Sequence, residues 1–245
     1  MSLMKKPAIL LIAILASFVF IFATSNKSFT VKKISTASVA TASTAKADNN
    51  STLFSELRLN EAGLNQTVFT SALHGLQKLE SKGVVKNENI ITIVDFSQPS
   101  NKKRLYVVDL QNKQILFNTL VAHGRNSGTL WAKSFSNDAS SLKSSPGFYV
   151  TEDTYFGHNG YSLRLDGQEK NINDNAANRA VVMHGAPYVD QSAINSLGFL
   201  GRSWGCPAVP MSQHKAIINT IKGGSCLFIY SADKNYTEKS TMLNS

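Results

Sequence analysis

The chain has 245 residues, enough for one ordinary domain with additions or for two small domains. Its formal net charge is +9, but the lysines and arginines are scattered and form no basic stripe with interleaved aromatic residues. We therefore expect no nucleic-acid partner. A cationic protein outside the cytoplasm suits an anionic wall or membrane surface, and general solubility explains the same charge equally well.

The N-terminus has the composition of an export signal. Lys5 and Lys6 precede a nearly unbroken apolar run over residues 8–23, which is long for a signal peptide and short for a membrane span. Residues 1–25 therefore predict either a cleaved signal peptide or a membrane anchor. Residues 26–50 are rich in Ser, Thr and Ala and predict a flexible linker. We expect an exported protein, periplasmic or wall-associated, either free or anchored in the inner membrane.

A helical segment is predicted next, over residues 51–83. Its apolar residues recur mostly at steps of three and four, with a break near Gly63 and a glycine stop at Gly83.

The period then changes to two, which is typical of strands. We expect strands at residues 90–94, 104–108, 114–121, 147–151, 179–183 and 226–230. One further helix is expected at residues 212–221. The polar stretch 124–167 contains too many aromatic residues for a disordered segment, so we expect ordered loops around a site there. This pattern predicts a mainly β (α+β) domain over residues 84–233, followed by a tail at 234–245.

One cysteine and one histidine stand in places that suit nucleophilic catalysis. His184 ends the apolar run RAVVM, and Cys206 follows Gly205, which permits a tight turn with exposed backbone N–H groups. A cysteine becomes a nucleophile when a base or a positive environment yields the thiolate and when donors face the developing oxyanion. The spacing between the two is weak evidence by itself, because such partners meet in space.

The surrounding residues resemble a known family. HGAPYV followed by SLGFLGRSWGCPAVP is similar to the L,D-transpeptidase catalytic domain, the YkuD-like family, and in particular to its murein L,D-transpeptidase branch. DFSQPSNKKRLYVVDL, VAHGRNSG, FSNDASSLKSSPGFY and SLRLDG extend the likeness over roughly residues 53–230. The resemblance implies an L,D-transpeptidase-like β-sandwich or barrel as the catalytic domain of residues 84–233.

The resemblance also implies a reaction. A cysteine thiolate attacks the third residue of a peptidoglycan tetrapeptide stem and releases the terminal D-alanine. The acyl group then passes to an amine of another stem, which forms a 3,3 crosslink, or to water, which is L,D-carboxypeptidase activity. Peptidoglycan stem peptides are the implied partners, and no cofactor is implied.

Residue roles follow from the same resemblance. Cys206 is the expected nucleophile, His184 the general base, and the Gly185 carbonyl the group that orients its imidazole. The backbone N–H groups of Gly205 and Cys206 are the expected oxyanion hole. The expected substrate-binding residues are Ser203, Arg202, Trp204, His123, Arg125, Ser127 and Tyr155. Trp204 stands where many relatives have a second histidine, which leaves the role of base to His184.

Two other interpretations stay open on the residues alone. One is an exported cysteine peptidase that acts on ordinary proteins. The other is a non-catalytic wall-binding module with a disulfide between Cys206 and Cys226, although Cys226 also reads as a core thiol in the apolar run CLFIY. No His-Glu-x-x-His or equivalent ligand spacing occurs, so we expect no metal site.

Overall fold

The computed structural model of the chain describes residues 49–244. The expected signal or anchor of residues 1–25 and almost all of the expected linker lie outside the described residues. Within the part that is described, no helix is both long enough and apolar enough to cross a membrane.

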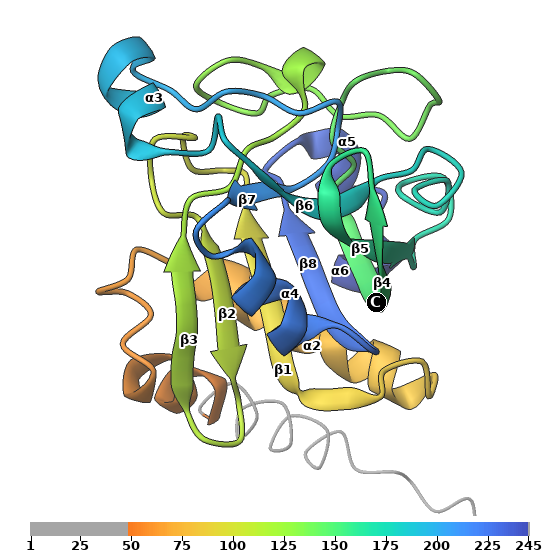
Figure 1. The fold of residues 1–245 in the computed structure, drawn as a ribbon. Coiled ribbons are helices and arrows are strands. Elements are labelled where there is room, and N and C mark those ends of the chain that lie inside the picture. Colours follow the sequence, from red (N-terminus) through yellow and green to blue (C-terminus); the bar gives the residue numbers. More distant parts are fainter. Residues whose placement is uncertain (1–48, 245) are drawn as a thin grey trace, which may run out of the picture.

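One mixed sheet of eight strands organises the fold, in the order β3-β2-β1-β8-β4-β5-β6-β7 (Figure 1). Neighbouring strands are antiparallel, except for the parallel pairs β1–β8 and β6–β7. The strands are β1 (Asn87–Asp95), β2 (Leu105–Asp109), β3 (Gln114–Thr119), β4 (Gly147–Gly157), β5 (Gly160–Gly167), β6 (Val182–Ala186), β7 (Ala208–Pro210) and β8 (Ser225–Tyr230).

Helices are few and mostly short. Residues 49–56 are helical. The others are α2 (Gln66–Ser81), the 3-10 turn η1 (Arg125–Ser127), α3 (Gln191–Leu197), α4 (His214–Ile221), α5 (Lys234–Thr237) and α6 (Thr241–Asn244).

The two edges of the sheet are joined by the chain that leaves β3. Ala122 forms an antiparallel bridge to Ala208 of β7, with a hydrogen bond of 2.8 Å from the Ala122 N–H to the Ala208 carbonyl. Because β3 and β7 are the outer strands, this bridge almost closes the sheet into a barrel. The predicted mainly β (α+β) fold of barrel type is confirmed.

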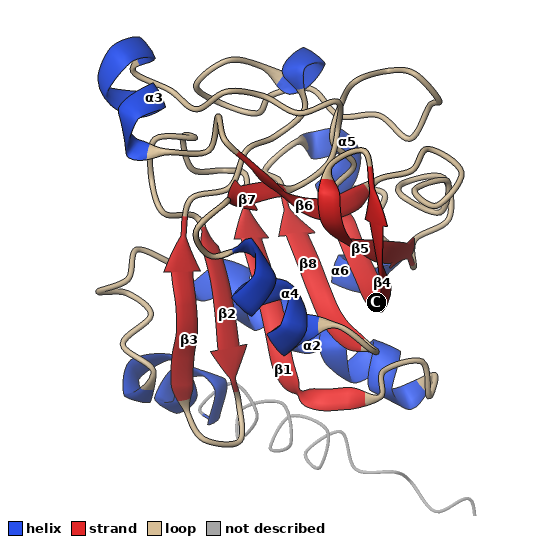
Figure 2. Cartoon of the chain, viewed as in Figure 1, coloured by secondary structure: helices blue, strands red, loops and turns tan. Residues whose placement is uncertain are grey.

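The central strands are buried on both faces, which explains their continuous apolar sequences. In β8, Cys226 and Phe228 face a core that contains α2, whereas Leu227 and Ile229 face a second core that contains α4. Figure 2 shows these two helices on opposite faces of the sheet. The helical N-terminal segment therefore packs directly on the β domain, as the apolar periodicity predicts.

Helix α2 begins and ends where its sequence indicates. The Asn65 side chain accepts a hydrogen bond from the Thr67 N–H at 2.8 Å, and Gly83 follows the helix with φ +67°. In the middle of the helix, a Cβ added to Gly75 would lie 2.0 Å from Cζ of Phe148. The glycine thus lets α2 approach the stacked Phe148 and Phe228 rings, whose centroids are 4.1 Å apart.

The C-terminal residues are part of the same core and not a free tail. Tyr236 of α5 and Met242 of α6 are buried in the α2 core. The buried Glu169 carboxylate accepts hydrogen bonds from the Phe148 N–H at 2.9 Å and from the Tyr236 hydroxyl at 3.3 Å. It also accepts one from the Ser240 hydroxyl. This carboxylate links the last two helices to the sheet.

Three sequence predictions in the second half of the chain need correction. The second part of the expected loop region 124–167 is the long hairpin β4–β5, whose outer half is largely solvent-exposed and has no apolar alternation. The strand expected at 179–183 begins later, at Val182, because Arg179 and Ala180 lie in a turn. The short elements α3 and β7 were not expected at all.

Candidate functional site

Strand β6 positions His184 between two neighbouring strands. Its Cα pairs with Ser162 of β5 on one side and with Ala208 of β7 on the other. The side chain is buried, and its Nδ1 lies 2.9 Å from the Gly185 carbonyl oxygen. Because a carbonyl oxygen only accepts, Nδ1 carries the hydrogen and Nε2 is the acceptor of the neutral ring. The expected contact with Gly185 is therefore present, while the catalytic role stays a prediction.

Burial, above all, lowers the pKa of His184 below its ordinary value of 6.5. The Gly185 carbonyl raises this pKa, and the nearby His214 lowers it further. The imidazole is therefore neutral near pH 7, which is the protonation state that a general base requires.

His214 of α4 supports this strand from behind. A Cβ on Gly185 would lie 2.6 Å from Cγ of His214, so glycine is needed for the helix to pack here. The His214 Nδ1 is 2.8 Å from the Met211 carbonyl, and the side chain is buried. Nothing in the sequence around His214 indicates that it packs against the strand that carries His184.

Cys206 lies in the turn that leads into β7, beside the start of β6. The register that pairs His184 with Ala208 puts Cys206 next to Val182, two residues before His184 on the same strand. The Cys206 Sγ accepts a hydrogen bond from the Val182 N–H at 3.5 Å, and the thiol donates to the Ala180 carbonyl at 3.7 Å. The thiol therefore lies against the strand that carries the imidazole, two residues along the strand from His184.

Burial raises the pKa of the Cys206 thiol, whereas three groups lower it. These groups are the Val182 N–H, the Arg179 guanidinium and the backbone N–H of Cys206 itself. The resting residue is accordingly a thiol, and the proton must leave during the reaction.

The turn before the cysteine is held by Ser203. The Ser203 hydroxyl donates to the Cys206 carbonyl at 2.6 Å and accepts from the Gly205 N–H at 3.1 Å. The Gly205 N–H is therefore engaged inside the turn, although it was expected to face an oxyanion. The Cys206 N–H lies against its own sulfur, and its expected role as an oxyanion donor stays a prediction. Gly205 itself has φ +129°, and a Cβ there would lie 2.8 Å from the Lys143 carbonyl oxygen.

Arg179 is a cation beside this turn that sequence reasoning missed. Its Nη2 would lie 3.4 Å from a Cβ on Gly205 and donates to the Lys143 carbonyl at 2.7 Å. Its Nη1 donates to the Ser136 carbonyl at 2.7 Å. A single arginine in the polar run NINDNAANRA gives no signal of this contact, because the loop that it binds lies more than thirty residues earlier.

Two of the expected substrate-binding residues are buried in the scaffold. His123 has no exposed surface; its Nδ1 is 2.8 Å from Nη2 of Arg104 and its Nε2 is 3.3 Å from the Gly128 carbonyl. Ser127 is also buried, and its hydroxyl accepts from the Ser144 N–H at 2.9 Å. Neither presents a free polar group to a substrate, so the structure favours a structural role for both.

Three further expected substrate-binding residues lie nearer the surface, whereas Ser203 is buried in the cysteine turn. Trp204 has 74% of its surface exposed beside Cys206, and the Arg125 side chain is exposed as well. Arg202 is half-buried and donates to the Gly128 carbonyl at 3.3 Å. Substrate contact by these three residues stays a prediction.

Tyr155 lines a small pocket beside the thiol. The pocket has a volume of about 110 Å³ and is also lined by Ala180 and Val182, the two residues that hydrogen-bond the Cys206 sulfur. The Arg164 guanidinium lies 4.3 Å from the centre of the Tyr155 ring. Tyr155, which lies in β4 and not in a loop, therefore lines the same pocket as the two partners of the sulfur, and substrate contact by Tyr155 stays a prediction.

The disulfide alternative is contradicted by the structure. Cys206 and Cys226 are both free thiols, and Cys226 is wholly buried in β8 against the α2 core. Within residues 49–244 there is also no group of three or more His, Cys, Asp or Glu side chains that could hold a metal ion.

Comparison with known proteins assigns these residues to a family. A family model described as the L,D-transpeptidase catalytic domain (YkuD_2) matches residues 60–230, a range that contains both His184 and Cys206. No curated protein matches the chain.

Solved structures that resemble the chain include an L,D-transpeptidase from Mycobacterium smegmatis, at 10% identity, TM-score 0.37 and coverage of 58% of this chain and 59% of that one. Another, from Mycobacterium tuberculosis H37Rv, has 14% identity, TM-score 0.35 and 58% coverage of each chain. A third, from Stackebrandtia nassauensis, has 14% identity, TM-score 0.36 and 68% coverage of each. The match thus spans less than two thirds of the first two proteins.

Proposed function

Because the chain belongs to the L,D-transpeptidase catalytic domain family, we propose that it transfers acyl groups on peptidoglycan tetrapeptide stems, with Cys206 as nucleophile and His184 as base. At the level of the family, this domain crosslinks peptidoglycan. The observation that carries the assignment to these residues is their position on β6 and in the turn before β7. The thiol hydrogen-bonds the strand that carries a neutral histidine, whose other ring nitrogen is fixed by Gly185.

The first half of the reaction forms a thioester. Nε2 of His184 takes the thiol proton while the Cys206 sulfur attacks the carbonyl carbon of the third stem residue. The Cys206 N–H donates to the oxyanion of the tetrahedral intermediate. The C–N bond to the terminal D-alanine then breaks, and His184 gives the proton to the leaving amine.

The second half releases the acyl group to an acceptor. An amine of another stem attacks the thioester carbonyl, loses a proton to His184 and forms a 3,3 crosslink. Water in place of the amine gives a free carboxylate, which is L,D-carboxypeptidase activity. In both cases the sulfur leaves and regains its proton from His184. Which acceptor reaches the thioester decides between the two products.

Product analysis from a defined substrate tests this function. The purified domain is incubated with disaccharide tetrapeptide, with and without an amine acceptor, and the products are identified by mass spectrometry. We expect release of D-alanine and either a crosslinked or a tripeptide product, together with a thioester adduct on Cys206.

The matched pair of variants for this experiment is Cys206→Ala and Cys226→Ala. Activity is expected to be absent from the first and retained in the second, because Cys226 is a core residue remote from solvent. Full activity in Cys206→Ala would refute the mechanism. Hydrolysis of ordinary L-L peptide bonds, with no action on the stem, would instead favour the exported cysteine peptidase.

The place of action is part of the same proposal. L,D-transpeptidase domains are usually extracytoplasmic, where their substrate is, and residues 1–25 have the composition of an export signal. Cell fractionation with mass determination of the mature N-terminus tests this, and a cytoplasmic protein that retains residues 1–25 would contradict it.

A further inference from the structure

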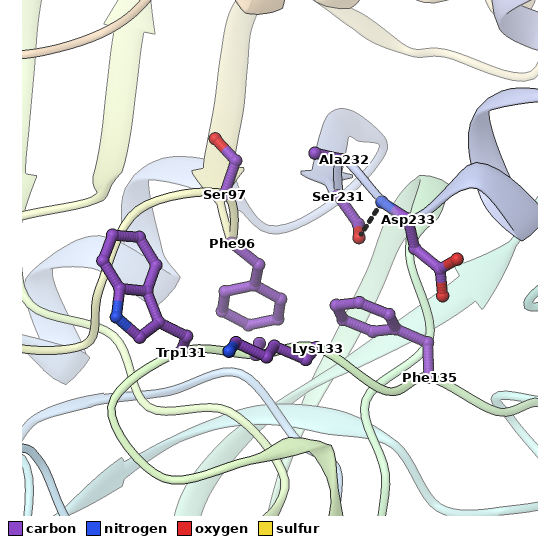
Figure 3. Close-up of a pocket in the computed structure, with 9 residues that line it drawn as sticks. Phe96, Ser97, Trp131, Lys133, Phe135, Ser231, Ala232 and Asp233 are labelled. Carbon is purple, nitrogen blue, oxygen red and sulfur yellow. Dashed lines mark hydrogen bonds between the residues drawn. The ribbon is translucent and has the colours of Figure 1, made fainter.

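A second, larger pocket lies on the other side of the loop that supports the cysteine turn. It has a volume of about 290 Å³ (Figure 3). Neither Cys206 nor His184 lines this pocket, and none of the catalytic or substrate-binding residues expected from the sequence lines it. Its lining residues are Phe96, Ser97, Trp131, Ala132, Lys133, Phe135, Ser231, Ala232 and Asp233.

The apolar part of this pocket consists of aromatic rings that lie in a row. Figure 3 shows Phe96 between Trp131 and Phe135. The Phe96 and Phe135 rings are nearly parallel, at 18°, with centroids 6.4 Å apart. Phe96 is fixed by the Arg104 guanidinium, 4.7 Å from its centre, whereas Trp131 keeps 43% of its surface exposed. Phe96 itself is buried, so the accessible apolar surface is that of Trp131 and Phe135, which favours a ligand with C–H groups on its face.

The rim of the pocket is polar and carries both signs of charge. Lys133 and Asp233 each face it, and within residues 49–244 neither has an ion-pair partner within 4.0 Å. The Ser231 hydroxyl accepts from the Asp233 N–H at 3.1 Å and keeps its own hydrogen for another acceptor. Because the rim carries one cation and one anion, it has no net positive charge that would attract a polyanion. Both charges also disfavour the burial of a lipid tail. Hydroxyl and amide groups complement such a rim.

The pocket and the cysteine turn share one supporting segment. On one side, the Ser203 N–H donates to the His123 carbonyl at 3.0 Å, and Arg202 donates to the Gly128 carbonyl. On the other side, the Lys133 N–H donates to the Ser127 carbonyl at 2.8 Å. Residues 123–128 therefore connect the aromatic pocket by direct hydrogen bonds to Arg202 and Ser203, in the turn before Cys206.

We propose that this pocket binds an N-acetylated sugar unit of the glycan strand that carries the stem peptide. The inference rests on the proposed function, because it names the substrate part held outside the reacting centre. The sugar ring packs its C–H face on the exposed Trp131 ring and the half-buried Phe135 ring, with the buried Phe96 beneath them as support. Its hydroxyl and acetamido groups accept from the Lys133 ammonium and donate to Asp233. The Asp233 Oδ1 already accepts from the Asn235 N–H at 2.9 Å as the N-cap of α5, so the other carboxylate oxygen is the acceptor for the ligand.

Binding of a peptide-free saccharide tests the pocket without any chemistry. The full chain with Cys206→Ala is titrated with chitotetraose, a tetramer of N-acetylglucosamine, by calorimetry and by tryptophan fluorescence. The sequence has two tryptophans, Trp131 and Trp204, so the signal can be assigned. We expect saturable binding, with a fluorescence change that persists in Trp204→Phe and is absent from Trp131→Phe.

The affinity of Trp131→Ala for chitotetraose is expected to fall by about tenfold or more, as for an aromatic anchor. Lys133→Ala, at the exposed rim, is expected to weaken binding by a smaller factor without changing the melting temperature. No binding to the parent chain, or equal binding by Trp131→Ala, would overturn the proposal.

Kinetics separates this inference from the proposed function. With disaccharide tetrapeptide, Trp131→Ala is expected to raise KM severalfold at unchanged kcat, whereas bare tetrapeptide is expected to react equally with both proteins. An equal effect on both substrates would overturn the saccharide assignment. Saccharide binding by a chain that shows no thioester chemistry would support the pocket and refute the proposed function.

Discussion

The backbone N–H of Val182 donates a hydrogen bond to the Sγ of Cys206 over 3.5 Å. A donor at this position favours the thiolate, and the Arg179 guanidinium acts in the same direction. Burial acts against both and leaves the pKa of Cys206 raised. The thiol is thus protonated at rest. The Val182 N–H and the Arg179 guanidinium are nevertheless in place to stabilise the thiolate once the proton leaves.

Arg179→Gln is expected to raise the pKa of Cys206 further, because it removes the guanidinium charge beside the turn. A change of one pKa unit corresponds to about 1.4 kcal/mol, and hence to about tenfold slower alkylation at pH values below the pKa. The measurement is the pH dependence of iodoacetamide labelling in a Cys226→Ala background, followed by mass spectrometry.

Arg179→Lys is the control for this charge. It keeps the cation but loses the forked hydrogen bonds to the Ser136 and Lys143 carbonyls, so it separates charge from loop support. For Arg179→Lys, we expect a pH dependence of iodoacetamide labelling close to that of the parent protein. An unchanged labelling profile in Arg179→Gln would show that the guanidinium does not influence the thiol.

The pH dependence of transfer reports the state of His184. Its pKa is lowered, first by burial, so the neutral base persists below pH 6.5 and activity is expected to fall only at lower pH. His214→Gln removes a charge that lowers this pKa, and its acid limb is expected to move to higher pH. An acid limb above pH 6.5 in the parent protein would contradict the lowered pKa.

His184→Gln tests the base itself. Glutamine keeps a polar side chain in the β6 position but has no nitrogen that titrates near neutral pH. The loss of general-base catalysis is expected to lower kcat by about 10²- to 10⁴-fold. Stopped or single-turnover assays of thioester formation measure this, and a loss confined to KM would argue against the role.

The apolar strands and the His184 and Cys206 motifs were predictable from the sequence. The residues that hold the cysteine turn and the histidine strand in place were not. Strands β1, β2 and β8 are buried on one or both faces, so their runs of Val and Ile residues predict them as strands. The first half of β4 was expected at 147–151, but the rest of the β4–β5 hairpin was missed because its outer half is exposed and closed by the polar turn at His158 and Asn159. Three-residue β7 is too short for any periodicity.

His123 and Arg179 show why individual roles are harder to predict than elements. His123 stands in a glycine-rich polar stretch typical of substrate loops, yet the chain after β3 crosses to β7 and buries it against Arg104. Arg179 stands in an equally polar stretch, and the fold brings it to the cysteine turn. Only the long-range strand pairings of the sheet decide that His123 is buried in the scaffold and that Arg179 lies beside the cysteine turn.

The buried pair of His123 and Arg104 is expected to make the fold sensitive to acid. Burial and the neighbouring guanidinium lower the pKa of His123 to about 4, whereas the unfolded value is 6.5. The unfolded chain therefore binds more protons between these values, and stability is lost as pH falls from 6.5 towards 4. The full contribution is about 3 kcal/mol at 1.36 kcal/mol per pKa unit.

His123→Asn is the variant that tests this sensitivity. Asparagine keeps an acceptor near Arg104, whose pKa of about 9 leaves it protonated at neutral pH. The free energy of unfolding in urea is expected to fall at pH 7, with a smaller difference from the parent at pH 4.5. Parallel stability curves for the two proteins across this range would contradict a neutral, buried His123.

Gly75 sets how closely α2 packs on the sheet. A methyl group there would lie 2.0 Å from Cζ of Phe148, a ring already stacked on Phe228 and unable to move without disturbing the core. Alanine gains about 1 kcal/mol of helix propensity, but overpacking costs about 1–3 kcal/mol or more. We expect Gly75→Ala to lower the free energy of unfolding, whereas Thr70→Ala, on the exposed face of the same helix, is expected to be neutral or slightly stabilising. Urea denaturation of both variants measures this, and a more stable Gly75→Ala would mean that α2 can shift away from the Phe148 ring at little cost.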